Sequence, residues 1–147
     1  MKKLRCAAPE ALLELSVAVI ELYFRLEAAT QAIAGFAHAG GEWGIMRSLI
    51  LNGDQTVPGM ARARPVSRQH CQGMVNRLCE QGLVEFVENP KHRRSHFVSI
   101  TKKGRVRFQA MTDQFLTAEA AFTPHFKAEE VAQAIEVLRR AHALLAL

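Results

Sequence analysis

The sequence is poor in the residues that build metal and redox centres. It contains three cysteines, one tryptophan and one tyrosine in 147 residues. The cysteines, at positions 6, 71 and 79, lack metal-ligand spacing, and the six histidines are spread along the chain. There is also no glycine-rich phosphate loop and no nucleophile–base–acid pattern. We therefore expect a protein that is not an enzyme and that holds no metal and no cofactor.

Long apolar runs are missing as well. No stretch reaches eighteen uninterrupted apolar residues, so we expect no membrane span. The basic start of the chain is followed by a segment with three glutamates, unlike the apolar core of a secretory signal. An odd number of cysteines without such a signal indicates reduced thiols and a cytoplasmic location. With 49% hydrophobic and 22% charged residues, the chain is expected to fold as one globular domain, residues 1–147.

Positive charge is concentrated in one third of the chain. Residues 58–107 hold eleven lysines and arginines against three glutamates, whereas the remainder holds eight against eleven acidic residues. Such an uneven distribution favours a polyanionic partner on one face of the molecule. A solvated basic face without a ligand is the alternative interpretation.

The middle of the chain has the pattern of a helix-turn-helix. A short helix over residues 58–64 turns Met60 inward, and a proline at position 65 ends it. Ser67 is a preferred N-cap for a second helix, and Gly82 supplies a left-handed C-cap. The inward face of this second helix has i, i+3, i+4, i+7 spacing and consists of Cys71, Met74, Val75 and Leu78.

The outward face of the second helix suits contact with DNA bases. It carries no carboxylate before Glu80. Asparagine and glutamine pair bidentately with adenine, and arginine pairs with guanine, in a major groove that admits a helix. A glycine within this face leaves room for close approach to the DNA backbone. The residues expected to contact DNA are Ser67, Arg68, Gln69, Gln72, Gly73, Asn76 and Arg77. An ordinary polar surface helix is the alternative.

A basic hairpin follows the helix-turn-helix. Residues 83–88 and 96–100 are expected to form strands around a loop that carries Lys91, His92, Arg93 and Arg94. Two adjacent arginines at a hairpin tip suit a narrow minor groove, because its negative potential attracts them. The next cations, Lys102 and Lys103 with Arg105 and Arg107, are expected to contact phosphates or only solvent.

Long helices flank this basic unit. Residues 9–34 carry apolar side chains over more than half of the helix circumference, which is broader than the stripe of a lone surface helix. We expect this helix to be buried on several sides, as it would be between two subunits. A helix over residues 42–51 and a short strand at Thr56 and Val57 precede the helix-turn-helix. Helices over residues 102–121 and 127–147 complete the chain.

Together these pieces resemble the multiple-antibiotic-resistance regulator (MarR) family of winged-helix regulators. The resemblance rests on GEWGIMRSL, SRQHCQGMVNRLCEQGLVE and NPKHRRSHFVSITKKG, and the flanking helices extend it over nearly the whole chain. It implies a mainly α fold with a small β-hairpin wing (α+β), with a winged helix-turn-helix over residues 42–104 between dimerisation helices at 1–36 and 105–147. It also implies a homodimeric repressor that binds double-stranded DNA at a pseudo-palindromic operator and is released by a small ligand or by thiol oxidation.

One position departs from the family pattern. Members usually carry an acid just before the wing arginines, whereas this chain has His92. The acid–arginine pairing that steadies the wing in the family is therefore in doubt for this chain.

The sequence leaves the trigger and one alternative function open. Tyr23, Phe24, Phe36, Trp43 and Met46 are candidates to line a pocket for a small aromatic effector, although aromatic residues at helical spacing are more often core. Cys6 lies just before the first helix, where some relatives sense peroxide, but only neighbouring cations are there to activate its thiol. The alternative function is a winged-helix dimer used for protein interaction, such as an antirepressor without operator specificity.

Overall fold

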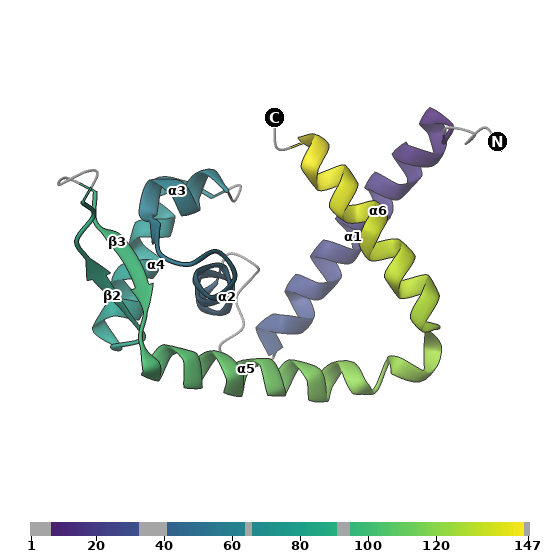
Figure 1. Cartoon of the computed structure of the whole chain (residues 1–147). Helices are drawn as coiled ribbons and strands as arrows, with labels where there is room; N and C mark the ends of the chain where they lie inside the picture. Colours follow the sequence, from purple (N-terminus) through teal and green to yellow (C-terminus); the bar gives the residue numbers. More distant parts are fainter. Residues whose placement is uncertain (1–6, 33–40, 64–65, 91–94, 146–147) are drawn as a thin grey trace.

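A computed structural model describes residues 7–32, 41–63, 66–90 and 95–145 of the chain (Figure 1). Within these residues the elements follow the order α1 (Pro9–Ala32), α2 (Glu42–Asn52), β1 (Gln55–Thr56), α3 (Val57–Arg62), α4 (Arg68–Glu80), β2 (Val84–Val87), β3 (Phe97–Ile100), α5 (Lys102–Ala120), the 3-10 turn η1 (Thr123–His125) and α6 (Ala128–Leu145). The predicted fold class, mainly helical with a small antiparallel sheet, is confirmed.

The three strands form one antiparallel sheet in the order β1-β3-β2. In the register of the sheet, Val98 of β3 lies opposite Gln55 of β1 on one side and Phe86 of β2 on the other. The hairpin of β2 and β3 was predicted from two strand-like runs around a loop, whereas the pairing with β1 was not predicted. The wing is therefore held at two places: β3 pairs with β1, which lies between α2 and α3, and β3 also leads directly into α5.

One hydrophobic core holds α2, α3, α4 and the sheet together. Met46 of α2, Met60 of α3, Val75 of α4 and Val98 of β3 are all inaccessible to solvent. Each comes from a different element, so the short helices and strands are stabilised mainly by burial against one another. We call this unit, residues 41–63 together with residues 66–90 and 95–100, the head.

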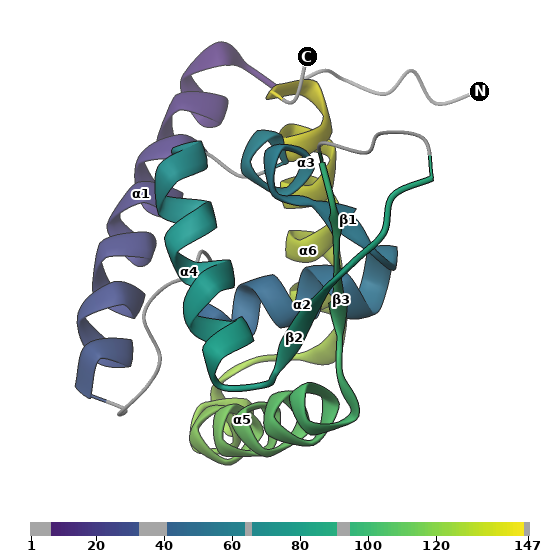
Figure 2. The same cartoon turned by 90° about the vertical axis from the view of Figure 1, so that its left-hand side faces the viewer.

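The long helices lie outside the head. α5 runs from the end of β3 along one side of the molecule, and α6 then turns back and crosses α1 at the opposite end from the head (Figure 1). Seen from the side of the head, α4 stands in front and the strands beside it (Figure 2). α5 is therefore the arm that joins the head to the α1–α6 pair.

The apolar surface of α1 and α6 is largely uncovered within one chain. Phe24 of α1 is 62% exposed and Leu138 of α6 is 41% exposed. We expected α1 to be buried on several sides, and a single chain does not bury it. Even so, no helix in the described part of the chain is long and apolar enough to cross a membrane.

The predicted position of the first strand was wrong by one residue. β1 is Gln55–Thr56 rather than Thr56 and Val57, and Val57 is the first residue of α3. The reason is a cap: the Thr56 hydroxyl accepts a hydrogen bond from the Gly59 backbone N–H at 3.2 Å, which starts the helix directly after the strand.

Candidate nucleic-acid interface

Local hydrogen bonds set both ends of α4. The Ser67 hydroxyl oxygen accepts from the His70 backbone N–H at 3.1 Å, which confirms the predicted N-cap. Gly82 has a φ of +70°, the left-handed conformation expected just past the end of the helix. The four residues predicted to face inward, Cys71, Met74, Val75 and Leu78, are all buried. Because that face is anchored in the core, the opposite face of α4 is turned to solvent.

The outward face of α4 forms a shallow groove. Arg68, Gln69, Gln72, Gly73 and Asn76 line it, and all five were predicted to contact DNA. The Gln72 amide nitrogen donates to the Asn76 amide oxygen at 2.9 Å, so two candidate base-contacting amides are already aligned. A Cβ added at Gly73 would meet only the Arg77 guanidinium, at 3.8 Å, which leaves this part of the face open.

The neck of the wing is closed by a buried amide. The Asn89 side chain is 6% exposed and its Nδ2 donates to the Ser95 carbonyl oxygen at 2.9 Å. This bond holds together the two sides of the hairpin beyond β2 and β3. The predicted wing-tip residues Lys91, His92, Arg93 and Arg94 lie outside the described residues.

A tight junction connects the wing to α5. The Thr101 hydroxyl accepts from the Gly104 backbone N–H at 3.0 Å, as expected for an N-cap, and donates to the Gly82 carbonyl oxygen at 2.8 Å. The Lys103 ammonium donates to the Gln81 carbonyl oxygen at 2.7 Å, at the end of α4. Lys102 and Lys103, both predicted as phosphate contacts, are exposed, and Lys103 thus also has a structural partner.

Trp43 forms a joint between the head and α5 that sequence analysis did not predict. Its indole N–H donates to the Thr112 hydroxyl at 3.0 Å. Its ring stacks on Phe108 at 5.6 Å between centroids and meets the edge of Phe115 at 5.4 Å. The Arg47 guanidinium lies 5.7 Å from the centroid of the Trp43 ring. A movement of α5 would therefore be transmitted directly to α2.

The five residues predicted as candidates for an effector pocket lie in different surroundings. Met46 is fully buried in the core of the head and Trp43 is partly buried in the joint with α5. Tyr23 and Phe24 lie on α1, exposed, with their ring centroids 5.7 Å apart. Phe36 lies outside the described residues. The core interpretation thus applies to Met46, whereas Tyr23 and Phe24 lie uncovered within one chain.

The two cysteines of α4 pack against the core. The Cys71 thiol is buried, with its sulfur 3.8 Å from the Val57 carbonyl oxygen, as the core interpretation predicted. Cys79 is partly buried against the same core. Cys6, the predicted redox candidate, lies outside the described residues. Within the described ranges no three histidine, cysteine or acidic residues gather into a potential metal site.

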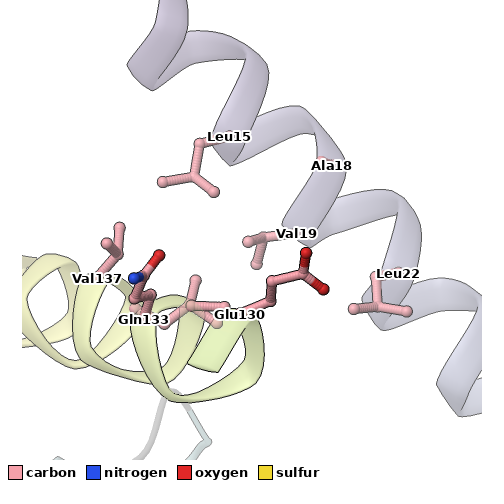
Figure 3. Close-up of a pocket in the computed structure, with 9 residues that line it drawn as sticks. Leu15, Ala18, Val19, Leu22, Glu130, Gln133 and Val137 are labelled. Atoms are coloured by element: carbon pink, nitrogen blue, oxygen red, sulfur yellow. The ribbon is translucent and has the colours of Figure 1, made fainter. Parts of the chain in front are cut away.

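A second groove lies between α1 and α6 (Figure 3). Leu15, Val19 and Leu22 of α1 point across it toward α6, where Val137 faces them. Glu130 and Gln133 of α6 are the polar residues that line it (Figure 3). The groove is apolar over most of its lining and is continuous with the exposed faces of both helices.

Comparison with known proteins shows what this part of the chain is similar to. Residues 38–95 match the model of the MarR family. An uncharacterized protein of Mycobacterium tuberculosis is 36% identical over 77 residues, covering 52% of this chain and 53% of that protein. The transcriptional activatory protein BadR of Rhodopseudomonas palustris is 32% identical over 96 residues, covering 57% and 54%. This chain thus spans about half the length of the curated relatives it matches.

The likeness of structure extends over almost the whole chain. A crystal structure of a MarR family transcription regulator is 25% identical, covers 93% of both chains and has a TM-score of 0.71. The family model matches the head, and the structural match adds the long helices around it.

Proposed function

We propose that this chain, of which residues 38–95 match the MarR family of transcription regulators, is a sequence-specific DNA-binding regulator of that family. In this proposal it acts as a homodimer on a pseudo-palindromic operator. α4 enters the major groove, and the wing reaches the adjacent minor groove. Lys102, Arg105 and Arg107 then lie near the phosphate backbone.

The observation that carries the proposal is the outward groove of α4. Its five lining residues include an arginine and three amide side chains and no carboxylate. Amide side chains pair bidentately with adenine edges, and an arginine binds either a guanine edge or a phosphate. The face is rigid, because the helix is capped at Ser67 and anchored by four buried residues on its other side. A helix face that only contacts water would need neither a rigid backbone nor aligned amide side chains, and it would not need to lack acidic residues.

The homodimer is supported by the uncovered surface of α1 and α6. Single soluble chains rarely leave such continuous apolar surface in water. The apolar groove between these helices would be filled by side chains of a second copy, and the two heads would then be held at a fixed spacing. A two-fold operator follows from that symmetry.

We further propose repression, by a dimer that covers the promoter, and release by a small ligand. The ligand would act at the Trp43 joint, since a shift of α5 there moves α2 and with it the head. Transcription in vitro from a promoter that carries the operator tests whether the protein represses or activates, because repression lowers the transcript yield when the protein is added. An increase in transcript yield would instead indicate activation, the role named for the relative BadR.

Quenching of the fluorescence of the single tryptophan by small aromatic compounds tests the ligand site.

Selection of bound DNA from a random pool, followed by footprinting, tests the central part of the proposal. We expect an enriched motif with two inverted half-sites about one helical turn, ~10 bp, apart. A salt series on that motif and on an unrelated duplex measures the specificity. If no sequence is enriched and binding is equally weak on both duplexes, the chain is instead a winged-helix protein-interaction module or antirepressor.

A further inference from the structure

A notch separates α4 from the base of the wing. Its lining comes from three places that are distant in sequence: Pro58 of α3, Arg68 and Gln72 of α4, and Phe86, Ser95 and His96 of the wing. Arg68 and Gln72 also line the outward groove of α4, so the two depressions share a border. Figure 2 shows α4 and the two wing strands side by side, and the residues that line the notch come from these elements, from the wing residues just before β3 and from α3.

The chemistry of the notch suits an anion joined to an apolar group. It contains a guanidinium, an imidazole, a hydroxyl and an amide, and no carboxylate is among its lining residues. Arg68 is the first residue of α4, so the positive end of the helix dipole adds to its charge. Phe86 is 43% exposed beside these polar groups, although it lies in the middle of a strand. A deoxyribose would cover such a ring.

Local hydrogen bonds fix the backbone on both sides of the notch. Arg68 follows the capping residue Ser67 directly, so its backbone position is fixed by the start of α4. Ser95 and His96 are fixed by the buried Asn89 amide, which donates to the Ser95 carbonyl oxygen, and by the start of β3. The backbone on both sides of the notch is therefore fixed, while the Arg68 and His96 side chains remain exposed to a ligand.

We propose that this notch holds one phosphodiester of the DNA backbone, with Arg68 and His96 donating to its oxygens and Phe86 packing on the neighbouring sugar. The inference rests on the proposed function. If α4 occupies the major groove and the wing the next minor groove, the strand that separates the two grooves must pass between them. The notch lies at that place. Arg68 then binds the DNA backbone, rather than contacting guanine as its position on α4 first suggested.

The test is a phosphate scan of the selected operator. Each phosphate of a half-site is replaced in turn by a neutral methylphosphonate, symmetrically in both half-sites. Dissociation constants are measured at fixed salt for the wild type, Arg68→Gln, His96→Gln and Arg105→Gln. All three residues are exposed, so the variants are expected to fold. Arg105→Gln is the control, because it removes the same charge outside the notch.

We expect the wild type to lose affinity on the order of tenfold at one phosphate between the major-groove and minor-groove contacts. Arg68→Gln should abolish that sensitivity and keep the wild-type base preference, and His96→Gln should reduce the sensitivity. Arg105→Gln should retain it. The proposal is overturned if Arg68→Gln changes the preferred bases, if it leaves the phosphate sensitivity intact, or if Arg105→Gln removes the same sensitivity. Failure to select any operator would instead overturn the proposed function itself.

Discussion

Single residues at the junction of α4, the wing and α5 decide whether the head can form. Gly104, in the first turn of α5, lies against the start of the wing, and an added Cβ would overlap the Leu83 carbonyl oxygen and come within 2.8 Å of Ile100 Cγ1. Backbone cannot move aside as a flexible side chain does. This position therefore requires glycine for space, although its φ is not one that only glycine adopts.

The first prediction compares two glycines in helices. Gly104→Ala should destabilise the fold by about 1–3 kcal/mol or more, because the methyl group forces backbone apart. Gly73→Ala should leave the fold unchanged or stabilise it by up to ~1 kcal/mol, since its Cβ site is open and alanine favours a helix. Urea unfolding of both variants measures the difference. Equal stabilities would show that α5 does not pack this closely on the wing.

Gly73→Ala also separates stability from binding. Its methyl group would stand in the outward groove of α4, where we propose that DNA lies. We expect weaker operator binding from a protein that is no less stable. Unchanged operator affinity would mean that DNA does not approach the helix at this point.

The second prediction separates two adjacent lysines. Lys102→Ala should weaken binding to all DNA sequences alike and lower the slope of log K against log salt by about 0.9 for each phosphate that the variant no longer neutralises. Lys103→Ala should in addition destabilise the fold by roughly 0.5–1.5 kcal/mol, because it removes the donor to the Gln81 carbonyl oxygen. Thermal unfolding and a salt titration on one duplex distinguish them. Identical behaviour of the two variants would contradict the assignment.

Residues whose role is local were predictable from the sequence, and those whose role depends on distant partners were not. Ser67 caps a helix through a neighbour three residues away, and Cys71 belongs to an apolar face of the same helix. The Trp43–Thr112 hydrogen bond joins residues 69 positions apart, and the Lys103–Gln81 bond spans 22. No periodicity or cap pattern contains such pairings, because the packing of whole elements creates them.

At the scale of elements, the wing is a hairpin supported on both sides. β3 is the central strand of the sheet, and Asn89 closes the neck above it. The two strand-like runs of the sequence predicted β2 and β3 to within one residue at each end. β1 has only two residues and was misplaced by one, because a two-residue strand carries no periodicity.

The third prediction concerns the tip of this element. At least one of Arg93→Ala and Arg94→Ala should reduce operator affinity strongly and leave the dimer intact, because an arginine gains from the potential of a narrow minor groove. The loss should be larger on operators with A·T-rich flanks than with G·C-rich flanks. Binding of both variants to both operator types at one salt concentration is the measurement. If both variants bound with wild-type affinity, the loop would be a solvated turn that does not contact DNA.

For the helices α1 and α6, the sequence predicted the apolar surface but not the partner that covers it. The breadth of the apolar face of α1 was evident from the sequence, and so was the need to cover it. The helix it crosses, α6, was not evident, since amphipathic faces of similar width are interchangeable in sequence. Together the two helices leave an apolar groove and exposed leucines that the described part of one chain does not cover.

At the scale of the whole molecule, the fourth prediction tests the dimer. Truncation before Lys127 removes α6 and one wall of the groove on α1. Since obligate dimers often lack a stable monomer, we expect insoluble or unfolded protein. Solubility, circular dichroism and sedimentation of the truncated and full-length chains provide the comparison. A folded, soluble monomer from the truncated chain would contradict an obligate dimer.

The central claim is that α4 contacts the bases and the surrounding cations hold the backbone. The measurement that tests it most directly is selection of DNA from one random pool by the wild type, by Gln72→Ala and by Lys102→Ala. The account predicts that Gln72→Ala changes the preferred base at one position of each half-site, at a cost of about 1–3 kcal/mol on the original operator. Lys102→Ala should select the wild-type motif with lower affinity. An unchanged motif from Gln72→Ala together with an altered one from Lys102→Ala would contradict it.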